Sequence, residues 1–177
     1  MIGTDAGWLA ERIRDIPDFP KPGVVYKDIT PLLADPLGLE LCVAALAEPF
    51  ADGAVDKVVG IEARGFILAA PVAMRLGAGF VPVRKPGKLP WEVIVDTYDL
   101  EYGSDTLEIH RDALAVGERV LVIDDVLATG GTASAGLRLV EVLGATTVGF
   151  GCVIELEFLA GRAKLGGLDV VSLLTYP

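Results

Sequence analysis

The chain has 177 residues, of which 52% are hydrophobic, and its formal net charge is −10. This length supports one domain with a sizeable core, and the apolar content excludes an intrinsically disordered chain. The negative charge disfavours nucleic acid as a partner, no apolar run is long enough to cross a membrane, and the first residues lack the pattern of a signal peptide, so we expect a cytoplasmic protein.

In chain order, residues 17–23 (PDFPKPG) are expected to be extended, because three prolines and a glycine oppose a helix. A helix follows, with Asp35 as its N-cap and Pro36 at its first position. It contains Cys42, which forms no metal or redox pattern with Cys152, so both are expected to be free thiols.

The rest of the chain alternates apolar strands with helices. We expect strands at 57–61, 79–83, 120–124, 146–156 and 168–176, and helices at 66–77 (although it contains Pro71, which disfavours a helix) and 132–144 (ended by Gly144). This alternation predicts an α/β fold, with a Rossmann-like parallel sheet covered by helices on both faces.

Residues 84–103 do not fit this pattern, because they contain no evident helix and only short apolar stretches. A compact domain seldom uses about twenty residues only as a connection. The segment is therefore either a β-hairpin built from VIVDTYDLEY and TLEIH, or a lid over a site, or both.

The stretch VLVIDDVLATGGT, 120–132, combines a buried strand, two adjacent acids and a Gly-Gly pair between threonines. In an open parallel sheet, ligands bind at the carboxyl ends of the strands, which is where Asp124 and Asp125 lie. The glycines and the first N–H groups of the following helix suit a phosphate, while the two carboxylates suit hydroxyls or a metal nearby. A ribose 5-phosphate has both features.

Other interpretations of this stretch were considered. The sequence contains neither the G-x-x-x-x-G-K-[ST] pattern of P-loop proteins nor the G-x-G-x-x-G pattern of dinucleotide-binding folds. An ordinary strand–turn–helix with a solvated acidic cap is the simplest alternative, and TGGT alone would favour it.

The motif VLVIDDVLATGGT resembles the phosphoribosyl-pyrophosphate loop of the type I phosphoribosyltransferases. Further blocks are similar to the adenine-specific branch of that family, and they span nearly the whole chain: IRDIPDFPKPGVVYKDITPLLADP, IEARGF, VRKPGKLP and YDLEYGSDTLEIHRDAL. The resemblance implies a single domain over 1–177, in which 1–34 is a base-binding hood segment, 84–105 a flexible hood loop and 120–132 the phosphoribosyl-pyrophosphate loop.

The implied reaction is transfer of a phosphoribosyl group to adenine, giving AMP and pyrophosphate in purine salvage. The family also implies a homodimer and Mg²⁺ that is held mainly through the substrate, with Asp124 as a possible ligand. A phosphoribosyltransferase for another nucleobase, or a non-enzymatic regulator that binds phosphoribosyl pyrophosphate, are the alternatives. The blocks VVYKD and LEYGSDTLEI oppose the first, and the lack of a basic surface or a spare DNA-binding segment opposes the second.

The resemblance also implies roles for individual residues. Asp124 and Asp125 would anchor the ribose hydroxyls, and the 5-phosphate would be held by Ala128, Thr129, Gly130, Gly131 and Thr132. Pyrophosphate would be bound by Arg64, after a cis peptide between Glu62 and Ala63, and by the basic residues Arg84, Lys85 and Lys88 of the hood.

The base would meet the backbone of Val25, with Lys27 beside it, although many relatives have arginine at the position of Lys27. Glu101 would assist proton transfer at the purine, and Tyr102 would position it. His110, the only histidine, matches no catalytic residue of the family and is expected to be structural.

Overall fold

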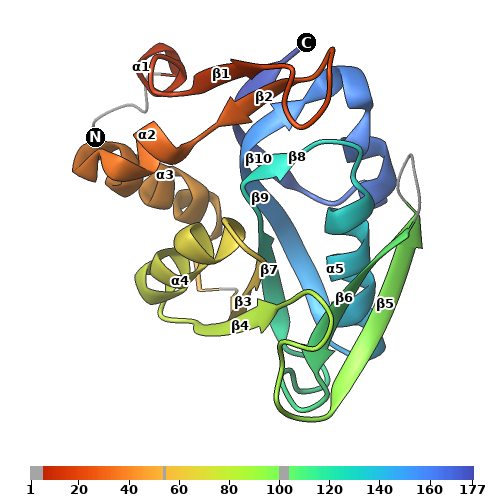
Figure 1. Ribbon diagram of the computed structural model, residues 1–177. Coiled ribbons are helices and arrows are strands. Elements are labelled where there is room, and N and C mark those ends of the chain that lie inside the picture. The colour runs from red at the N-terminus through yellow and green to blue at the C-terminus, as the bar shows by residue number, and fades with distance from the viewer. Residues whose placement is uncertain (1–5, 54, 100–103) are drawn as a thin grey trace.

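The computed structural model describes residues 6–53, 55–99 and 104–177. Its centre is a parallel sheet in the order β10–β9–β7–β3–β4, with the short β8 beside β9 (Figure 1). The strands are β3 (Lys57–Ile61), β4 (Gly79–Val83), β7 (Arg119–Ile123), β8 (Val126–Leu127), β9 (Thr146–Leu156) and β10 (Val170–Tyr176). The predicted parallel sheet is therefore confirmed, with strand bounds that differ from the expected ones by at most two residues.

Helices cover both faces of this sheet, as its continuous apolar strands require. Helices α3 (Pro36–Ala47) and α4 (Gly65–Leu76) lie on one face, and α5 (Gly131–Val142) lies on the other (Figure 1). Successive strand residues face opposite layers, so Val58 packs in the cluster under α3 and α4 while Val59 packs in the cluster under α5. Cys42 and Cys152 are fully buried free thiols, one in each cluster.

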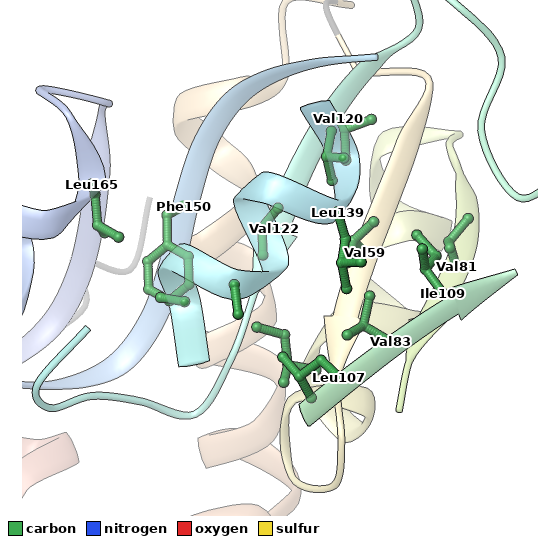
Figure 2. Close-up of a cluster of buried hydrophobic side chains, with 14 of the residues drawn as sticks. Val59, Val81, Val83, Leu107, Ile109, Val120, Val122, Leu139, Phe150 and Leu165 are labelled. Carbon is green, nitrogen blue, oxygen red and sulfur yellow. The ribbon is translucent and has the colours of Figure 1, made fainter. Parts of the chain in front are cut away.

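The segment from Arg84 onward forms an antiparallel hairpin of β5 (Val93–Asp99) and β6 (Ser104–His110). Its inner side belongs to the core, because Leu107 and Ile109 of β6 are fully buried beside Leu139 of α5 (Figure 2). The hairpin expectation is confirmed. Packing against α5 anchors the base of the hairpin at the side of the sheet.

The N-terminal segment contains elements that the sequence pattern did not predict. They are α1 (Ala6–Ala10), the antiparallel hairpin of β1 (Arg14–Pro17) and β2 (Val25–Asp28), and α2 (Thr30–Ala34). Between β1 and β2 the chain turns, with a cis Phe19–Pro20 peptide and Asp18 at a φ of 58°. The expectation that 17–23 is not helical is confirmed, but the expectation that it is extended is wrong beyond Pro17, because residues 18–23 form the turn. This hairpin lies beside the C terminus of the chain (Figure 1).

Helix boundaries follow the expected signals. The Asp35 side chain caps α3 by accepting hydrogen bonds from Leu37 N at 3.0 Å and Gly38 N at 3.2 Å. Pro71 lies inside α4, and Gly144, at a φ of 79°, follows the end of α5. Short 3₁₀ turns complete the fold at η1 (Glu48–Phe50), η2 (Glu157–Leu159) and η3 (Gly161–Leu165). Within the described ranges, no helix is both long and apolar enough to span a membrane.

The order of the strands locates a binding site. From β3 the chain moves outward to β4, and it then returns to the other side of β3 to form β7. Adjacent strands whose connections leave in opposite directions open a crevice at their carboxyl ends, where ligands of α/β sheets bind. The loops after β3 and β7 are therefore the ones to examine.

Candidate active site

The acidic pair at the end of β7 is buried and held by backbone hydrogen bonds. The side chains of Asp124 and Asp125 belong to residues that are only 7% and 6% exposed. The carbonyl of Asp125 accepts hydrogen bonds from Val153 N at 3.0 Å and Ile154 N at 3.1 Å, which fixes the loop against β9. The alternative interpretation of this pair as a solvated acidic cap is therefore wrong.

The two carboxylates differ in their electrostatic environment. Burial, and then the charge of Asp125, raise the pKa of Asp124 well above its ordinary value. Asp125 instead pairs with Arg64, whose Nε lies 2.5 Å from Asp125 Oδ2. Asp124 thus favours a proton or a nearby cation, whereas the charge of Asp125 is matched by the guanidinium of Arg64.

Arg64 follows β3 and comes directly before α4. The peptide between Glu62 and Ala63 is cis, as the family resemblance implied. The next residue, Gly65, packs so tightly that a Cβ there would lie 3.0 Å from both Asp124 Oδ1 and Ile123 O. A residue without a side chain at this position lets the loops after β3 and β7 meet, and this brings Arg64 to the acidic pair.

The loop from Ala128 to Thr132 leads into α5. Gly130, at a φ of 76°, is the N-cap of α5 and offers no side-chain cap, so the first N–H groups of the helix are directed at the space before it. The loop is supported from behind by Gly161, since a Cβ at Gly130 would overlap the Gly161 carbonyl. The predicted phosphate cradle therefore has the backbone geometry that an anion requires.

These loops surround one polar cavity of about 270 Å³. Its lining includes the acidic pair, Arg64, Lys85 and every residue of the predicted phosphate loop: Ala128, Thr129, Gly130, Gly131 and Thr132. Most of the residues that the sequence assigned to phosphoribosyl pyrophosphate are thus brought together, although they come from three separate parts of the chain.

The basic residues of the hood converge on a carboxylate that the sequence did not single out as a site residue. Glu62 Oε1 lies 2.5 Å from Lys88 Nζ, Glu62 Oε2 lies 3.3 Å from Arg84 Nε, and the Lys85 N–H donates to Oε2 at 2.9 Å. Burial alone would raise the pKa of Glu62, but the hydrogen bonds from Lys88, Lys85 and Arg84 outweigh it and lower that pKa to about 2. Arg84 and Lys88 therefore face an ionised carboxylate.

A second cavity, of about 630 Å³, lies under the β1–β2 hairpin and is mostly apolar. Val25 and Phe158, which are 50% and 65% exposed, contribute to its walls together with Tyr176. Lys27 also lines it, but its Nζ is ion-paired with Asp15 Oδ1 at 2.7 Å. Exposed apolar side chains around a hollow suit a flat, largely apolar ligand such as a purine.

Thr129 lines both cavities. The polar cavity and the apolar cavity are therefore adjacent, with the phosphate loop between them. A ligand with a charged sugar phosphate joined to a flat base matches this arrangement.

Several residues of this site gave no signal in the sequence. Tyr26 has Arg64 at 5.6 Å from the centre of its ring, and burial, offset in part by the Arg64 charge, raises its pKa. Phe158 and Tyr176 reach the apolar cavity from more than 100 residues further along the chain. Only knowledge of which strands and hairpins lie side by side could have identified them.

Three residues discussed from the sequence remain to be located: Glu101, Tyr102 and His110. Glu101 and Tyr102 lie outside the described residues. His110 ends β6 opposite Val93, away from both cavities, and its Nε2 is buried without a hydrogen-bond partner in the described structure. Its expected lack of a catalytic role stays a prediction.

A metal would find few protein ligands here. Within residues 6–53, 55–99 and 104–177 no group of three or more His, Cys, Asp or Glu side chains could hold a metal ion. The acidic pair fits a divalent cation that takes most of its oxygens from a bound ligand, because Asp124 favours a nearby positive charge.

Comparison with known proteins agrees with this geometry. A model of the phosphoribosyl transferase domain matches residues 29–166. An adenine phosphoribosyltransferase of Solibacter usitatus is 60% identical over 168 residues, which cover 95% of this chain and 97% of that protein. The crystal structure of adenine phosphoribosyltransferase from Rhodothermus marinus is 52% identical, with a TM-score of 0.92 over 97% of this chain and 98% of that one.

A third similar protein was solved with ligands. The enzyme of Saccharomyces cerevisiae, in complex with adenine and an imino-altritol bisphosphate, is 42% identical, with a TM-score of 0.90 over 96% of this chain and 98% of that chain. Each of these three relatives covers at least 95% of this chain.

Proposed function

Since the chain belongs to the phosphoribosyl transferase domain family and, within it, to the adenine phosphoribosyltransferases, we propose which of its residues carry out each part of the reaction. The chain transfers the 5-phosphoribosyl group of 5-phosphoribosyl 1-pyrophosphate to adenine, giving AMP and pyrophosphate in purine salvage. The observation that supports the assignment of roles is the pair of adjacent cavities, one polar and one apolar, that share Thr129.

The 5-phosphate is held by the loop from Ala128 to Thr132. The first N–H groups of α5 and the hydroxyls of Thr129 and Thr132 donate to its oxygens. The helix dipole contributes only about 0.3–1 kcal/mol per nearby charge, so these hydrogen bonds provide most of the affinity. This grip is remote from the bond that breaks, and it serves to orient the sugar.

Asp124 and Asp125 hold the 2′ and 3′ hydroxyls of the ribose. Their negative charge also stabilises the positive charge that develops on the sugar ring as the bond at C1 breaks. The contact of Asp125 with Arg64, at 2.5 Å, keeps the carboxylate oriented until substrate binds.

Pyrophosphate is bound by Arg64 and by Arg84, Lys85 and Lys88 at the base of the hood. Because Glu62 now accepts from the last three residues, the incoming phosphate oxygens replace its carboxylate oxygens as their partners. Mg²⁺ would be held mainly by oxygens of the substrate, with Asp124 as the candidate protein ligand, and would neutralise charge on the leaving group.

Adenine lies in the apolar cavity, in the base-binding segment 1–34. Val25 presents backbone groups to the purine edge, and Lys27 stays paired with Asp15 beside the ring of Tyr176, 4.2 Å from Lys27 Nζ. The yeast relative bound to adenine, and a Giardia lamblia relative bound to 9-deazaadenine, support a purine as the ligand.

Glu101 assists the loss of the N9 proton of adenine, by a hydrogen bond to a ring nitrogen or by relaying the proton, and Tyr102 positions it. Closure of the hood, residues 84–105, shields the reacting sugar from water. Glu101→Gln is expected to lower turnover by about 10²–10⁴-fold while binding of phosphoribosyl pyrophosphate, measured by calorimetry without adenine, is nearly intact.

Base selectivity provides a direct test of the apolar cavity as the adenine site. Adenine offers N–H donors at its 6-amino group and an acceptor at N1, and hypoxanthine reverses both. Each buried mismatch costs about 1–3 kcal/mol, so kcat/KM with labelled hypoxanthine should be lower by one to several orders of magnitude. Equal efficiency on both bases would exclude specific recognition of the adenine edge.

The chain is also proposed to form a homodimer and to act in the cytoplasm. Ile67 and Met74, seven residues apart on α4, are 46% and 83% exposed, and Phe80 on β4 is 39% exposed. Exposed apolar side chains of this size suit a homodimer contact. Met74→Glu should shift the sedimentation coefficient toward that of a monomer. The two free cysteines fit a reducing cytoplasm.

A further inference from the structure

A chain of polar groups connects the phosphate loop to the hood hairpin. Thr132 Oγ1, in the first turn of α5, lies 3.1 Å from the hydroxyl oxygen of Tyr98 on β5. That hydroxyl donates to Asp105 Oδ2 at 3.2 Å, and Asp105 lies opposite Tyr98 on β6. Lys85 Nζ donates to the same Asp105 oxygen and approaches the Tyr98 hydroxyl at 3.5 Å.

Tyr98 is fixed in place apart from its hydroxyl. The residue is 6% exposed and packs in the core cluster with Leu107 and Ile109 of the neighbouring strand. The ring therefore cannot move without disturbing the core, while the hydroxyl hydrogen is free to rotate. Tyr98 can redirect a hydrogen bond at almost no cost in packing.

The chemistry of the partners sets the direction of these hydrogen bonds. An ionised Asp105 can only accept, so the Tyr98 O–H points to it, and the Tyr98 oxygen accepts the O–H of Thr132. A phosphate can also only accept. When it binds, the Thr132 O–H must turn toward it, and the contact with Tyr98 survives only if the Tyr98 O–H turns toward Thr132.

We propose that Tyr98 is a positioning residue for the 5-phosphate, which acts by donating its hydroxyl hydrogen to Thr132 when Thr132 donates to the phosphate. Lys85 Nζ and the Thr106 N–H remain as donors to Asp105, so its carboxylate keeps two of its three hydrogen bonds. Phosphate binding thereby breaks the hydrogen bond from Tyr98 to Asp105, reverses the direction of the one between Tyr98 and Thr132, and adds one from Thr132 to the phosphate. This inference rests on the proposed role of Thr132 in the phosphate cradle.

The test compares ligands that contain the 5-phosphate with one that lacks it. In Tyr98→Phe the ring and its packing are retained and only the hydroxyl is lost. Calorimetry should show about 3- to 10-fold weaker binding of ribose 5-phosphate and AMP, as the loss of one hydrogen bond predicts, and binding of inorganic pyrophosphate unchanged within two-fold. KM for phosphoribosyl pyrophosphate should rise more than kcat falls.

Thr97→Val is the matched control. Thr97 precedes Tyr98 on β5, is exposed, and its hydroxyl lies 3.3 Å from that of Thr106 across the same hairpin. Thr97→Val removes one hydroxyl and its contact with Thr106 and leaves the contact between Tyr98 and Thr132 in place, so binding of ribose 5-phosphate should stay unchanged. Thermal unfolding of both variants checks that the fold is retained.

A double-mutant cycle with Thr132→Val separates the inference from the proposed function. If Tyr98 acts through Thr132, the double variant binds ribose 5-phosphate no more weakly than Thr132→Val alone. Losses that multiply, unchanged binding in Tyr98→Phe, or an equal loss for pyrophosphate would each overturn the inference while the phosphate role of Thr132 stands. Unchanged binding in Thr132→Val would reject that role and the inference with it.

Discussion

The loops at the sheet edge and the two hairpins over them hold their functional side chains by different means. Asp124 and Asp125 are buried, and backbone hydrogen bonds to β9 fix their loop. The cations of the hairpins are held by acids instead, as Lys27 is by Asp15 and Lys88 by Glu62. The sheet edge is therefore organised before substrate binds, whereas Lys88 is held by Glu62 in an ion pair that a phosphate can replace, and Lys27 is held by Asp15 beside the apolar cavity.

This difference matters for energetics. Partly exposed ion pairs contribute about 0–1 kcal/mol, so exchanging their partners has a low cost. Displacing a buried backbone loop costs several times more, because packing and hydrogen bonds are lost together. Substitutions at the sheet edge should consequently have larger effects than substitutions in the hairpins, and the following predictions test this order.

The largest effect is expected for Asp125→Asn. The change keeps the shape of the side chain but removes the charge that pairs with Arg64 and stabilises the reacting sugar. We expect kcat/KM to fall by about 10²-fold or more, with circular dichroism showing a retained fold. An unfolded variant would mean that the acidic pair is structural. Asp96→Asn, an acid of the hood hairpin, serves as the control with expected near-parent activity.

Gly161→Ala should have the next largest effect. A Cβ there would overlap the Ala128 carbonyl oxygen and lie 2.8 Å from Gly130 N, so the phosphate loop has to move. We expect KM for phosphoribosyl pyrophosphate to rise by about 10-fold, since roughly 1.4 kcal/mol of loop displacement is enough. Gly130→Val should also raise KM for phosphoribosyl pyrophosphate, because its Cβ would overlap the Gly161 carbonyl.

Gly166→Ala is the control for that experiment. Gly166 ends the same 3₁₀ turn at a φ of 62°, and a Cβ there would meet nothing within 4 Å. It should lower stability by about 1–2 kcal/mol through backbone strain and leave KM unchanged. A matching rise in KM for both variants would show that strain, and not contact with the phosphate loop, is responsible.

A smaller, pH-dependent effect is expected for Glu62, where sheet edge and hood meet. Its pKa, about 2, is lower than that of an ordinary glutamate, so its ionised form stabilises the fold at pH values above the unfolded pKa of about 4.5. That contribution is lost as the pH falls through 2. The difference in free energy of unfolding between parent and Glu62→Gln should shrink over pH 4.5 to 2 in urea titrations. A constant difference would mean that the ion pairs are too well screened to matter.

The smallest effect is expected for the ion pair that ties the hood hairpin to α5. Arg138 Nη2 lies 2.7 Å from Asp96 Oδ2, and the arginine is largely exposed. Arg138→Ala should lower the free energy of unfolding by less than about 1 kcal/mol and leave KM unchanged. A change of KM larger than that of Gly161→Ala would reverse the proposed order of the two regions.

The sheet edge was also the part of the site that the sequence predicted. Continuous apolar runs such as KVVGI and VLVI are typical of buried parallel strands, and the residues that follow them must lie at one edge. Asp124, Asp125, Arg64 and the phosphate loop could be assigned for this reason. The burial of Asp124 and Asp125 could not be predicted, because it depends on how closely β9 and Gly65 approach their loop.

The hairpin side was not predicted to the same extent. Strands β1 and β2 have four residues each and no clear alternation, and they are joined by antiparallel backbone pairing in which Lys27 lies opposite Asp15. The contact of Glu62 with Arg84 follows from the register in which Ile61 pairs with Val83, and that register is not visible in either strand alone. Contacts between distant segments depend on pairing, which a single sequence does not reveal.

The two buried thiols can be used to measure local opening of the fold. Burial raises the pKa of Cys42 to about 11, and burial, opposed in part by the Ser172 hydroxyl, raises that of Cys152 to about 12. Since the thiolate is the reactive form, neither sulfur will react with an alkylating reagent until its surroundings open. Cys42 lies in the layer under α3 and α4 and Cys152 in the layer under α5, so the labelling rate of each thiol will report the opening of its own side of the sheet.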